Sequence, residues 1–364
     1  MAGMGFGPRI KKFWSGMGRS SRSVAKLSTG SVLAQLIMVA VSPILTRMYS
    51  PGEIGVLAAF LALVGPVAML ATGGYSQAVV LPETERRAIE LVTFVLTLIA
   101  LVSLAALIVV FLAVPLVGQD GQQLAWVYWL PLGVAVSASH SVLLSLANRY
   151  SRYELMASSS VIKSASQALG QVSIGLIAPS PTSLVGVTAA ASVSGNVGLA
   201  RLYLRGLLRT RPRTTEMLSA AREYGRFPRY TLPSGLLSQA QLAGLPLVIG
   251  TLFGASTLGL WSLTQRLLSA PLTVLGTAVS DVYFRRAIEM RRHQGDTVRL
   301  FRRVLLRLAV LSAPPFMLLA VFAPWLFGTI FGPEWEQAGI YARIAVPWFW
   351  VRFFSSPLSR TTIV

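Results

Sequence analysis

The sequence contains no cysteine, and this absence excludes disulfide bonds, thiolate metal sites and a cysteine nucleophile. Charge is also scarce, because only 12% of the 364 residues are charged, whereas soluble domains contain about a quarter. Acidic residues are the rarest, with 13 Asp and Glu against 32 Lys and Arg, which gives a formal net charge of +19. Apolar residues make up 54% of the chain, and the mean hydropathy is +0.63. This composition excludes an ordinary soluble domain and indicates a membrane protein.

The residue patterns of common enzyme and metal sites are missing too. None of the Lys residues follows a Gly, so no Walker A loop is present to hold a nucleotide phosphate. The two His residues, His140 and His293, are far apart in the sequence and poorly supplied with acids, which argues against a metal site or a catalytic triad. His140 lies within an apolar segment, where it either bonds to a neighbouring helix or relays protons. We expect no enzyme activity, no metal ion and no cofactor.

Apolar segments separated by short polar breaks run along the chain. Most are close to the roughly 20 residues that a helix needs to cross a bilayer, and the longer ones are expected to tilt. The sequence therefore predicts an all-α polytopic membrane protein with about ten transmembrane helices. The predicted spans are 27–46, 54–76, 91–117, 124–147, 155–177, 184–204, 229–252, 257–283, 304–328 and 339–358.

Basic residues alternate between the two sides of these spans. The N-terminal arm is basic, and the even-numbered spans end at arginines such as Arg86 and Arg149. The opposite loops, GQDGQQ, APSPTS, FGAS and FGPEWEQ, contain no Lys or Arg. This alternation is the positive-inside pattern, and it predicts a cytoplasmic N-terminus in a plasma (inner) membrane. The net charge then reflects topology and attraction to membrane lipid headgroups, and nucleic-acid binding is not expected.

The chain also contains an internal repeat. Residues 31–57 align with residues 235–261, so that Gln35 matches Gln239 and Gly55 matches Gly259. Six spans separate the copies, which predicts two parallel halves with a pathway between them, although apolar helices also share Gly and Pro by chance. The predicted organisation is a basic cytoplasmic arm (1–26), an N-terminal six-helix lobe (27–204), a basic cytoplasmic linker (205–228) and a C-terminal lobe (229–364). The repeat predicts that this second lobe has four helices and lacks a closing pair.

Polar side chains form a stripe on each of two spans. The fifth span carries Ser160, Lys163, Ser164, Gln167, Gly170 and Gln171, and the eighth carries Ser262, Gln265, Arg266, Ser269, Thr273, Thr277 and Ser280. Stripes of this kind face a bundle interior or a wet cavity, because exposing them to lipid is costly. The hydroxyls are also explained by packing between helices. Lys163 and Arg266 point to function, because ionisable groups inside a membrane are expensive to keep.

The sign of the membrane charges indicates the class of cargo. The cations within or near the spans are Arg47, Lys163, Arg266, Arg343 and Arg352, whereas the comparable acid is Asp281. A cationic interior suits an anionic cargo, and guanidinium groups bind phosphate through two parallel hydrogen bonds. Arg47, Arg343 and Arg352 are equally well explained by snorkelling to an interface. The expected substrate site contains Arg266, Lys163 and Arg47, lined by Gln35, Gln239, Gln167, Gln265, Ser269 and Thr273.

Three segments resemble a known family: LTRMYSPGEIGVLA (45–58), GYSQAVVLPETERRA (74–88) and LTQRLLSAPLTVLGTAVSDVYFRRA (263–287). They are similar to bacterial oligosaccharide flippases, the O-antigen and capsule-unit translocases of the multidrug/oligosaccharidyl-lipid/polysaccharide exporter superfamily. The resemblance implies two six-helix lobes around a cationic cavity bordered by the first, second, seventh and eighth helices. It also implies transfer of an undecaprenyl-diphosphate-linked oligosaccharide between leaflets, with a polysaccharide polymerase and chain-length machinery as partners. Family members have twelve or more helices, whereas this sequence ends within or just after its tenth span.

Two other functions fit a polytopic protein of this composition. A membrane glycosyltransferase or repeat-unit polymerase would expose acidic or Arg-bearing sites on a sizeable outer loop, and the outer loops here are short. A drug or cation antiporter of the same superfamily would carry buried carboxylates in its N-terminal spans, and these contain none. The sequence therefore favours a flippase driven by an ion gradient or by substrate supply.

Overall fold

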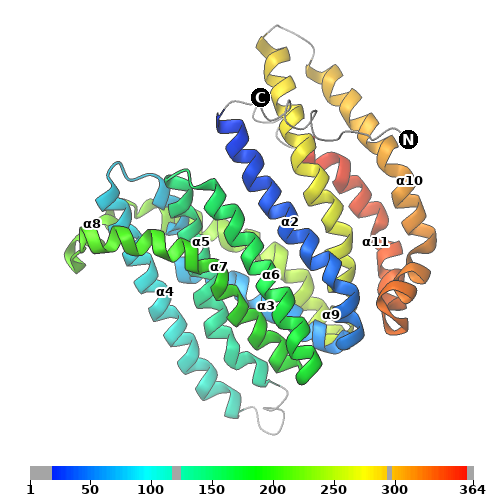
Figure 1. Ribbon diagram of the computed structural model, residues 1–364, viewed down its shortest axis with the longest axis horizontal. Helices are drawn as coiled ribbons and strands as arrows, with labels where there is room; N and C mark the ends of the chain where they lie inside the picture. Colours follow the sequence, from blue (N-terminus) through cyan, green and yellow to red (C-terminus); the bar gives the residue numbers. More distant parts are fainter. Residues whose placement is uncertain (1–18, 117–123, 293–296, 359–364) are drawn as a thin grey trace, which may run out of the picture.

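The computed structural model describes residues 19–116, 124–292 and 297–358, and every regular element within them is helical (Figure 1). The N-terminal half contains α2 (Arg19–Met48), α3 (Pro51–Thr72), α4 (Glu85–Ala113), α5 (Leu130–Arg149), α6 (Tyr153–Ile177) and α7 (Pro181–Thr210). It is followed by α8 (Thr214–Glu223), α9 (Arg226–Arg292), α10 (Thr297–Phe331) and α11 (Glu336–Ser355). Short 3-10 turns form at η1 (Tyr75–Val80), η3 (Ala125–Trp129) and η4 (Pro333–Trp335).

These helices confirm the expected all-α membrane fold. Each predicted span coincides with a helix or with one arm of α9, a 67-residue helix interrupted at Gly254, where φ is 84°. Seven helices of the described chain are long and apolar enough to cross a membrane. That number is below ten because α9 counts once, and because the polar residues of α6 and α11 lower their mean hydropathy. Of the predicted basic arm (1–26), residues 1–18 lie outside the described residues. The remainder belongs to α2, which begins at Arg19.

A Ser-Pro pair begins helix α3. The Ser50 hydroxyl accepts a hydrogen bond from the backbone N–H of Glu53, while the Glu53 carboxylate accepts one from the backbone N–H of Ser50 over 2.8 Å. Pro51 occupies the first helical position, where a missing N–H costs nothing. The same device, Ser180 followed by Pro181, begins α7. Capping therefore fixes where α3 and α7 turn back across the molecule.

The helices form two groups that meet along α3 and α9. In Figure 1, helices α4 to α8 lie together on one side, α10 and α11 lie on the other, and α2 runs between them. Helix α2 packs along α6, α3 packs along α9, and α10 packs along α11. This arrangement agrees with two lobes that are joined through the first and second arms of α9.

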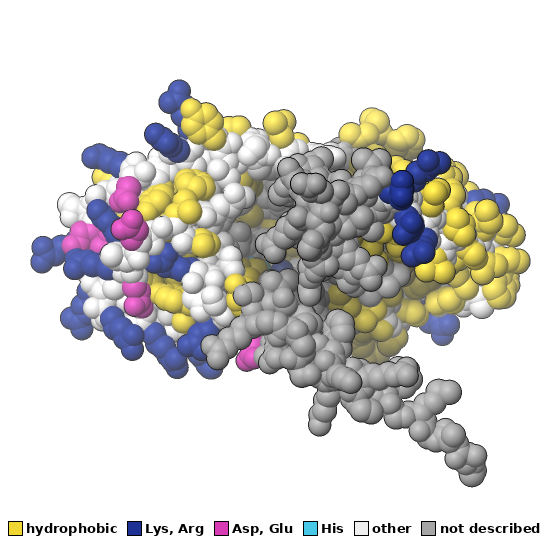
Figure 2. Space-filling view, turned by 90° about the horizontal axis from the view of Figure 1, so that it is seen from above, with side chains coloured by type: hydrophobic (Ala, Val, Ile, Leu, Met, Phe, Trp, Pro, Cys, Tyr) yellow, Lys and Arg dark blue, Asp and Glu magenta, His cyan; other side chains and the backbone are white. Residues whose placement is uncertain are grey.

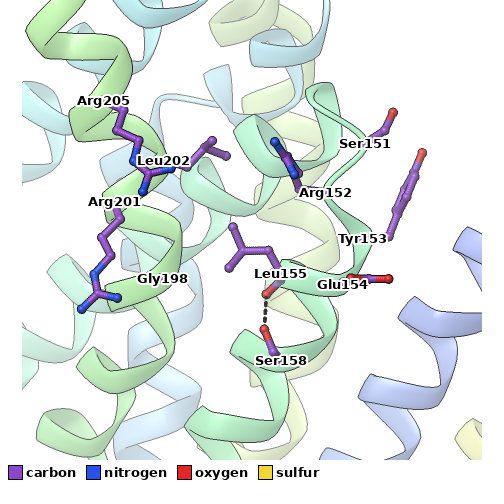
Figure 3. Close-up of a pocket in the computed structure, with 10 residues that line it drawn as sticks. All are labelled: Ser151, Arg152, Tyr153, Glu154, Leu155, Ser158, Gly198, Arg201, Leu202 and Arg205. Atoms are coloured by element: carbon purple, nitrogen blue, oxygen red, sulfur yellow. Dashed lines mark hydrogen bonds between the residues drawn. The ribbon is translucent and has the colours of Figure 1, made fainter.

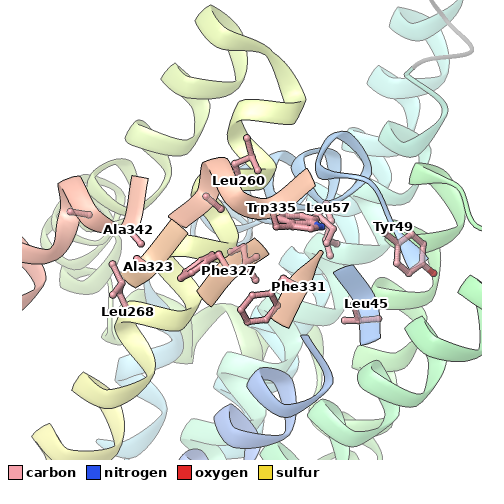
Figure 4. Packing of buried hydrophobic residues seen from close by; sticks show 14 of the residues in the cluster. Leu45, Tyr49, Leu57, Leu260, Leu268, Ala323, Phe327, Phe331, Trp335 and Ala342 are labelled. Carbon is pink, nitrogen blue, oxygen red and sulfur yellow. The ribbon is translucent and has the colours of Figure 1, made fainter. Parts of the chain in front are cut away.

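Two buried apolar clusters stabilise these groups. One lies inside the N-terminal half and includes Ile89, Val142 and Leu199. The other crosses between the halves, and Figure 4 shows its packing around Phe327 and Trp335. Because each of these five side chains is 2% exposed or less, burial of apolar area contributes both to the first lobe and to its contact with the second.

Large apolar side chains are also exposed along the outer faces of the helices. Leu112, Leu169, Leu252 and Leu311 are examples, one each from α4, α6, α9 and α10. An apolar surface of this extent is costly in water and is normal against lipid. The exposed faces therefore agree with a multi-pass membrane protein.

Arginines gather at one end of the molecule, which we call the basic end. Figure 2, a view from the top of Figure 1, shows Lys and Arg side chains over the part that contains α8 and the ends of α4 to α7. Arg86 pairs with Glu90 and Glu216, and Arg87 pairs with Glu90 and Glu223. The stretch predicted as a basic linker, 205–228, thus completes α7 and forms α8, which these ion pairs connect to α4.

Candidate functional site

The two halves touch through a reciprocal pair of glycines. A Cβ atom placed on Gly55 would overlap the backbone carbonyl of Ala255, and one placed on Gly259 would overlap the backbone carbonyl of Pro51. Each glycine lies 204 residues from its counterpart in the sequence repeat, as does Pro51 from Ala255. The contact therefore relates α3 and the second arm of α9 by an approximate two-fold axis, and only glycine allows so close an approach of backbones.

The same end of the molecule is closed by two buried hydrogen bonds. The indole N–H of Trp335 donates to the backbone carbonyl of Thr46 over 3.0 Å, which joins the loop between α10 and α11 to α2. The hydroxyl of Tyr49 donates to the backbone carbonyl of Gln171 over 2.8 Å, which joins α2 to α6. Together with the glycine contact, these bonds seal what we call the closed end, opposite the basic end.

A pocket of about 350 Å³ lies between α3 and the two arms of α9. Arg266, Gln265, Ser269 and Ser262 line it from the second arm, so four of the seven residues of the polar stripe predicted for the eighth span face one cavity. Apolar residues complete its walls from α3 and from the first arm. These are Ala58, Leu61, Ala62 and Gly65 of α3 and Leu242, Ala243 and Pro246 of α9.

Two hydrogen-bond donors in this pocket have no partner among the described residues. Arg266 is partly buried, and no described residue forms an ion pair or hydrogen bond with its guanidinium. The indole N–H of Trp261, another lining residue, is buried and also has no partner. No acidic residue occurs among the described residues of the lining. The pocket therefore presents a cation without a described counter-charge, and its chemistry suits an anion.

Lys163 lies elsewhere, inside the N-terminal half, and does not line the Arg266 pocket. Its Cβ packs against Gly195 of α7, and it is close enough to His140 for their charges to interact. The Nδ1 atom of His140 lies 2.6 Å from the Oδ1 atom of Asn196, which links α5 to α7. This bond agrees with the structural role considered for His140.

The remaining predicted residues also lie outside the Arg266 pocket. Arg47 is exposed at the closed end, in a separate pocket that contains Glu53 and Glu334. The side-chain amide of Gln239 packs on Gly65 of α3, beside the Arg266 pocket. Gln35 and Gln167 are partly buried on α2 and α6, and Thr273 is exposed on α9.

The two other arginines that the sequence placed near the membrane have partners of their own. Arg343 donates a hydrogen bond to the backbone carbonyl of Val321 over 3.0 Å. The Arg352 guanidinium lies 5.4 Å from the ring centre of Trp348, in a cation–π contact. The side chain of Asp281 lies outside the described residues. Only Arg266 among the predicted cations therefore lines the pocket between the halves.

The sequence analysis missed Trp261 as a site residue. An aromatic residue in an apolar span is usually assigned to the lipid face or the core, and nothing in its type points to a ligand. Its position was nevertheless a signal, because Trp261 precedes Gln265 by four residues and therefore lies on the same face of the helix.

Comparison with known proteins supports a transport function. Residues 44–339 match the family model described as polysaccharide biosynthesis protein. No significant relative was found among proteins with curated functions. An inward-facing multidrug resistance MATE family transporter of the MOP superfamily superposes with a TM-score of 0.61 at 15% identity, over 92% of this chain and 82% of that chain.

Two further solved structures share the fold. A MATE protein in complex with MaD3S superposes with a TM-score of 0.52 at 12% identity, over 95% of this chain and 84% of that chain. A MOP superfamily transporter from Pyrococcus furiosus, described by the reverse polarity of its binding pocket, has the same score and identity over 94% and 83%. The chain therefore belongs to the polysaccharide biosynthesis protein family and is a multi-pass membrane protein that shares its fold with transporters of the MOP superfamily.

Proposed function

We propose that this transporter moves a polyprenyl-diphosphate-linked oligosaccharide from the cytoplasmic to the periplasmic leaflet of a bacterial inner membrane. The observation that carries the proposal is the Arg266 pocket, because an arginine without an acidic partner lies there between the two halves. A diphosphate is a natural ligand for this group, since a guanidinium binds phosphate oxygens through two parallel hydrogen bonds.

The other residues of the pocket suit a saccharide next to the diphosphate. Gln265, Ser262 and Ser269 offer an amide and two hydroxyls, and the Trp261 indole offers an aromatic surface. The walls from α3 are apolar and suit the first part of a lipid tail. A drug or cation antiporter is less well supported, because a cationic drug would be repelled by Arg266 and would find no carboxylate in this lining.

The proposed direction follows from the two ends of the molecule. We place the basic end in the cytoplasm, because cytoplasmic loops are rich in Lys and Arg. The closed end, where Trp335 bonds to Thr46, would then face the periplasm. In this orientation the closed end would separate the pocket from the periplasm, and we expect transport to require that the contact between Gly55 and Gly259 separates.

The test is to replace Arg266 and measure ligand binding to the purified protein. Loss of one charge-assisted contact to phosphate is worth about 1.5–3 kcal/mol, which corresponds to about 10- to 150-fold in affinity. Arg266→Ala should weaken binding of a polyprenyl diphosphate by that factor and leave binding of the uncharged polyprenol unchanged. Arg266→Lys should recover only part of the affinity, because an ammonium lacks the planar fork.

The matched control is Arg222→Ala, which removes an exposed arginine at the basic end. We expect this variant to bind the diphosphate as the unmodified protein does. In cells that lack their own flippase, the control should support surface polysaccharide and Arg266→Ala should not. Unchanged diphosphate affinity in Arg266→Ala would refute the proposed site, and elongation of the saccharide by the purified protein would favour a polymerase.

A further inference from the structure

The basic end contains a second pocket, separate from the site between the halves. It has a volume of about 740 Å³ and lies between the start of α6 and the last turns of α7. Figure 3 shows Arg201 and Arg205 on α7 at one side, Arg152 on the other, and Leu155 between them. Ser151 and Ser158 add two hydroxyls.

The arginines of this pocket have no acidic partner among the residues that the structure describes. Arg152, Arg201 and Arg205 are exposed, and no described residue forms an ion pair or side-chain hydrogen bond with their guanidinium groups. Glu154 is the one acidic residue in the lining, and it has an interaction of its own. Elsewhere at the basic end arginines do have acidic partners, as Arg86 has in Glu216. Three guanidiniums around one pocket therefore call for an anionic ligand.

An apolar track leads from this pocket along the outer face of α7. Val193, Val197 and Arg201 are spaced by four residues and thus lie on one face of the helix. Both valines are exposed, at 42% and 47%. The track from Val193 to Arg201 is about 12 Å long, at about 1.5 Å of rise per residue.

The neighbouring helix, α6, also carries an exposed apolar residue next to the pocket. On α6, Ser158 lines the pocket and Ile162 follows one turn later, 48% exposed. Gly198 allows α6 and α7 to approach, because a Cβ placed on it would already lie 3.0 Å from the Cδ1 atom of Leu155. The groove that this pocket forms between α6 and α7 therefore contains arginines and hydroxyls, and exposed apolar residues follow it on both helices, further from the basic end.

From this arrangement we infer that the groove between α6 and α7 binds an anionic phospholipid of the surrounding bilayer. The headgroup phosphate contacts Arg152, Arg201 and Arg205, and an acyl chain lies along Val197 and Ile162. A soluble anion would use the arginines and leave the apolar track without a role, whereas a zwitterionic lipid would leave the positive charge unbalanced. The inference does not depend on the cargo of the pocket at Arg266.

The experiment measures lipid retention by the purified protein in detergent. Phosphatidylglycerol and phosphatidylcholine with the same acyl chains are titrated in parallel, and bound lipid is counted by native mass spectrometry. The triple variant Arg152→Gln/Arg201→Gln/Arg205→Gln should bind phosphatidylglycerol about 100-fold more weakly, since each cation near a membrane surface contributes about a factor of five. The single variant Arg201→Gln should bind it about fivefold more weakly and gives a second measurement if the triple variant is unstable.

The matched control removes three arginines at the same end that do not line the pocket. These are Arg211, Arg222 and Arg226, each replaced by Gln. The control should retain phosphatidylglycerol like the unmodified protein, which would separate the pocket from a general effect of net charge. Glycerol phosphate, the headgroup chemistry without acyl chains, should not displace the lipid when present at equal concentration.

Three results would overturn the inference. The first is equal retention of phosphatidylglycerol by the unmodified protein and the triple variant. The second is equal retention of phosphatidylcholine and phosphatidylglycerol by the unmodified protein. The third is displacement of the lipid by glycerol phosphate, which would make the groove a site for free phosphate esters.

Discussion

Replacing Gly259 with alanine would test whether the glycine contact holds the closed end together. A Cβ on Gly259 would lie 2.9 Å from the backbone nitrogen of Gly55 and would overlap the carbonyl of Pro51. Both neighbours are backbone atoms of α3, so neither can rotate away as a side chain would. The added methyl is therefore accommodated only if α3 and α9 move apart.

The size of the effect follows from the cost of overpacking. One extra methyl group in a close-packed contact costs about 1–3 kcal/mol. In the proposed transport cycle this contact separates, so we expect the cost to fall on the closed state and to lower the ratio of closed to open molecules by about 5- to 150-fold. Gly55→Ala should have the same effect, because the repeat places Gly55 in the equivalent position.

The absence of cysteine gives a direct assay of this ratio. Gly52 and Ser256 face each other across the contact, and a Cβ on Gly52 would lie 3.3 Å from the Oγ atom of Ser256. The Oγ of Ser256 takes the place that a cysteine sulfur would occupy, and in a disulfide each Cβ lies roughly 3 Å from the partner sulfur. The pair Gly52→Cys/Ser256→Cys should therefore cross-link rapidly on mild oxidation, and adding Gly259→Ala should slow the reaction by the factor above.

A matched control is available on the same helix. A Cβ added to Gly244 meets no atom within 4 Å, so Gly244→Ala should leave the cross-linking rate unchanged. Equal rates with and without Gly259→Ala would refute the reasoning, because they would show that the closed end accepts a methyl group without opening.

Three further predictions concern other parts of the molecule. Trp335→Phe removes the indole that donates to a buried carbonyl of α2 and should lower the free energy of unfolding by about 1–3 kcal/mol, measured by thermal unfolding in detergent; an unchanged melting temperature would contradict it. A hydrogen bond from the backbone N–H of Arg213 and the charge of Arg86 lower the pKa of Glu216 from its usual value of 4.5. Helix α8 should therefore stay docked on α4 above pH 4.5 and lose hydrogen-exchange protection as the pH falls through the lowered pKa; constant protection would count against this role of Glu216. Pro179→Cys should react with an impermeant thiol reagent outside intact cells and Thr214→Cys should not, and the reverse pattern would refute the proposed orientation.

The helices could be predicted from the sequence because long apolar runs are a strong signal. Helices in arginine-rich stretches were less predictable, because their apolar residues are few. Helix α8 lies in a stretch of alternating arginines that was interpreted as a linker, yet Ala220 and Ala221 are buried and Met217 is partly buried. A ten-residue helix with a narrow apolar face gives a weak pattern, and its docking depends on ion pairs with α4 that sequence periodicity does not define.

The candidate site was predictable only within one helix. Gln265, Arg266 and Ser269 line the same pocket because their spacing places them on one face of α9, which is a local property. Whether Lys163 shares that pocket depends on how α6 is rotated and where it packs, and no pattern on α6 defines this. The repeat identified Gly55 and Gly259 as equivalent, but their contact became evident only from the backbone geometry.

The glycine contact also bears on how the two halves can change over time. Backbone atoms make this contact, so Gly55 and Gly259 have to remain small while the residues around them are free to differ. A deletion of one residue between Pro51 and Gly55 would rotate α3 by about 100° and move its glycine away from Ala255. The contact therefore depends on the register of the two helices and on the size of two residues, and it places no requirement on the other side chains that the halves share.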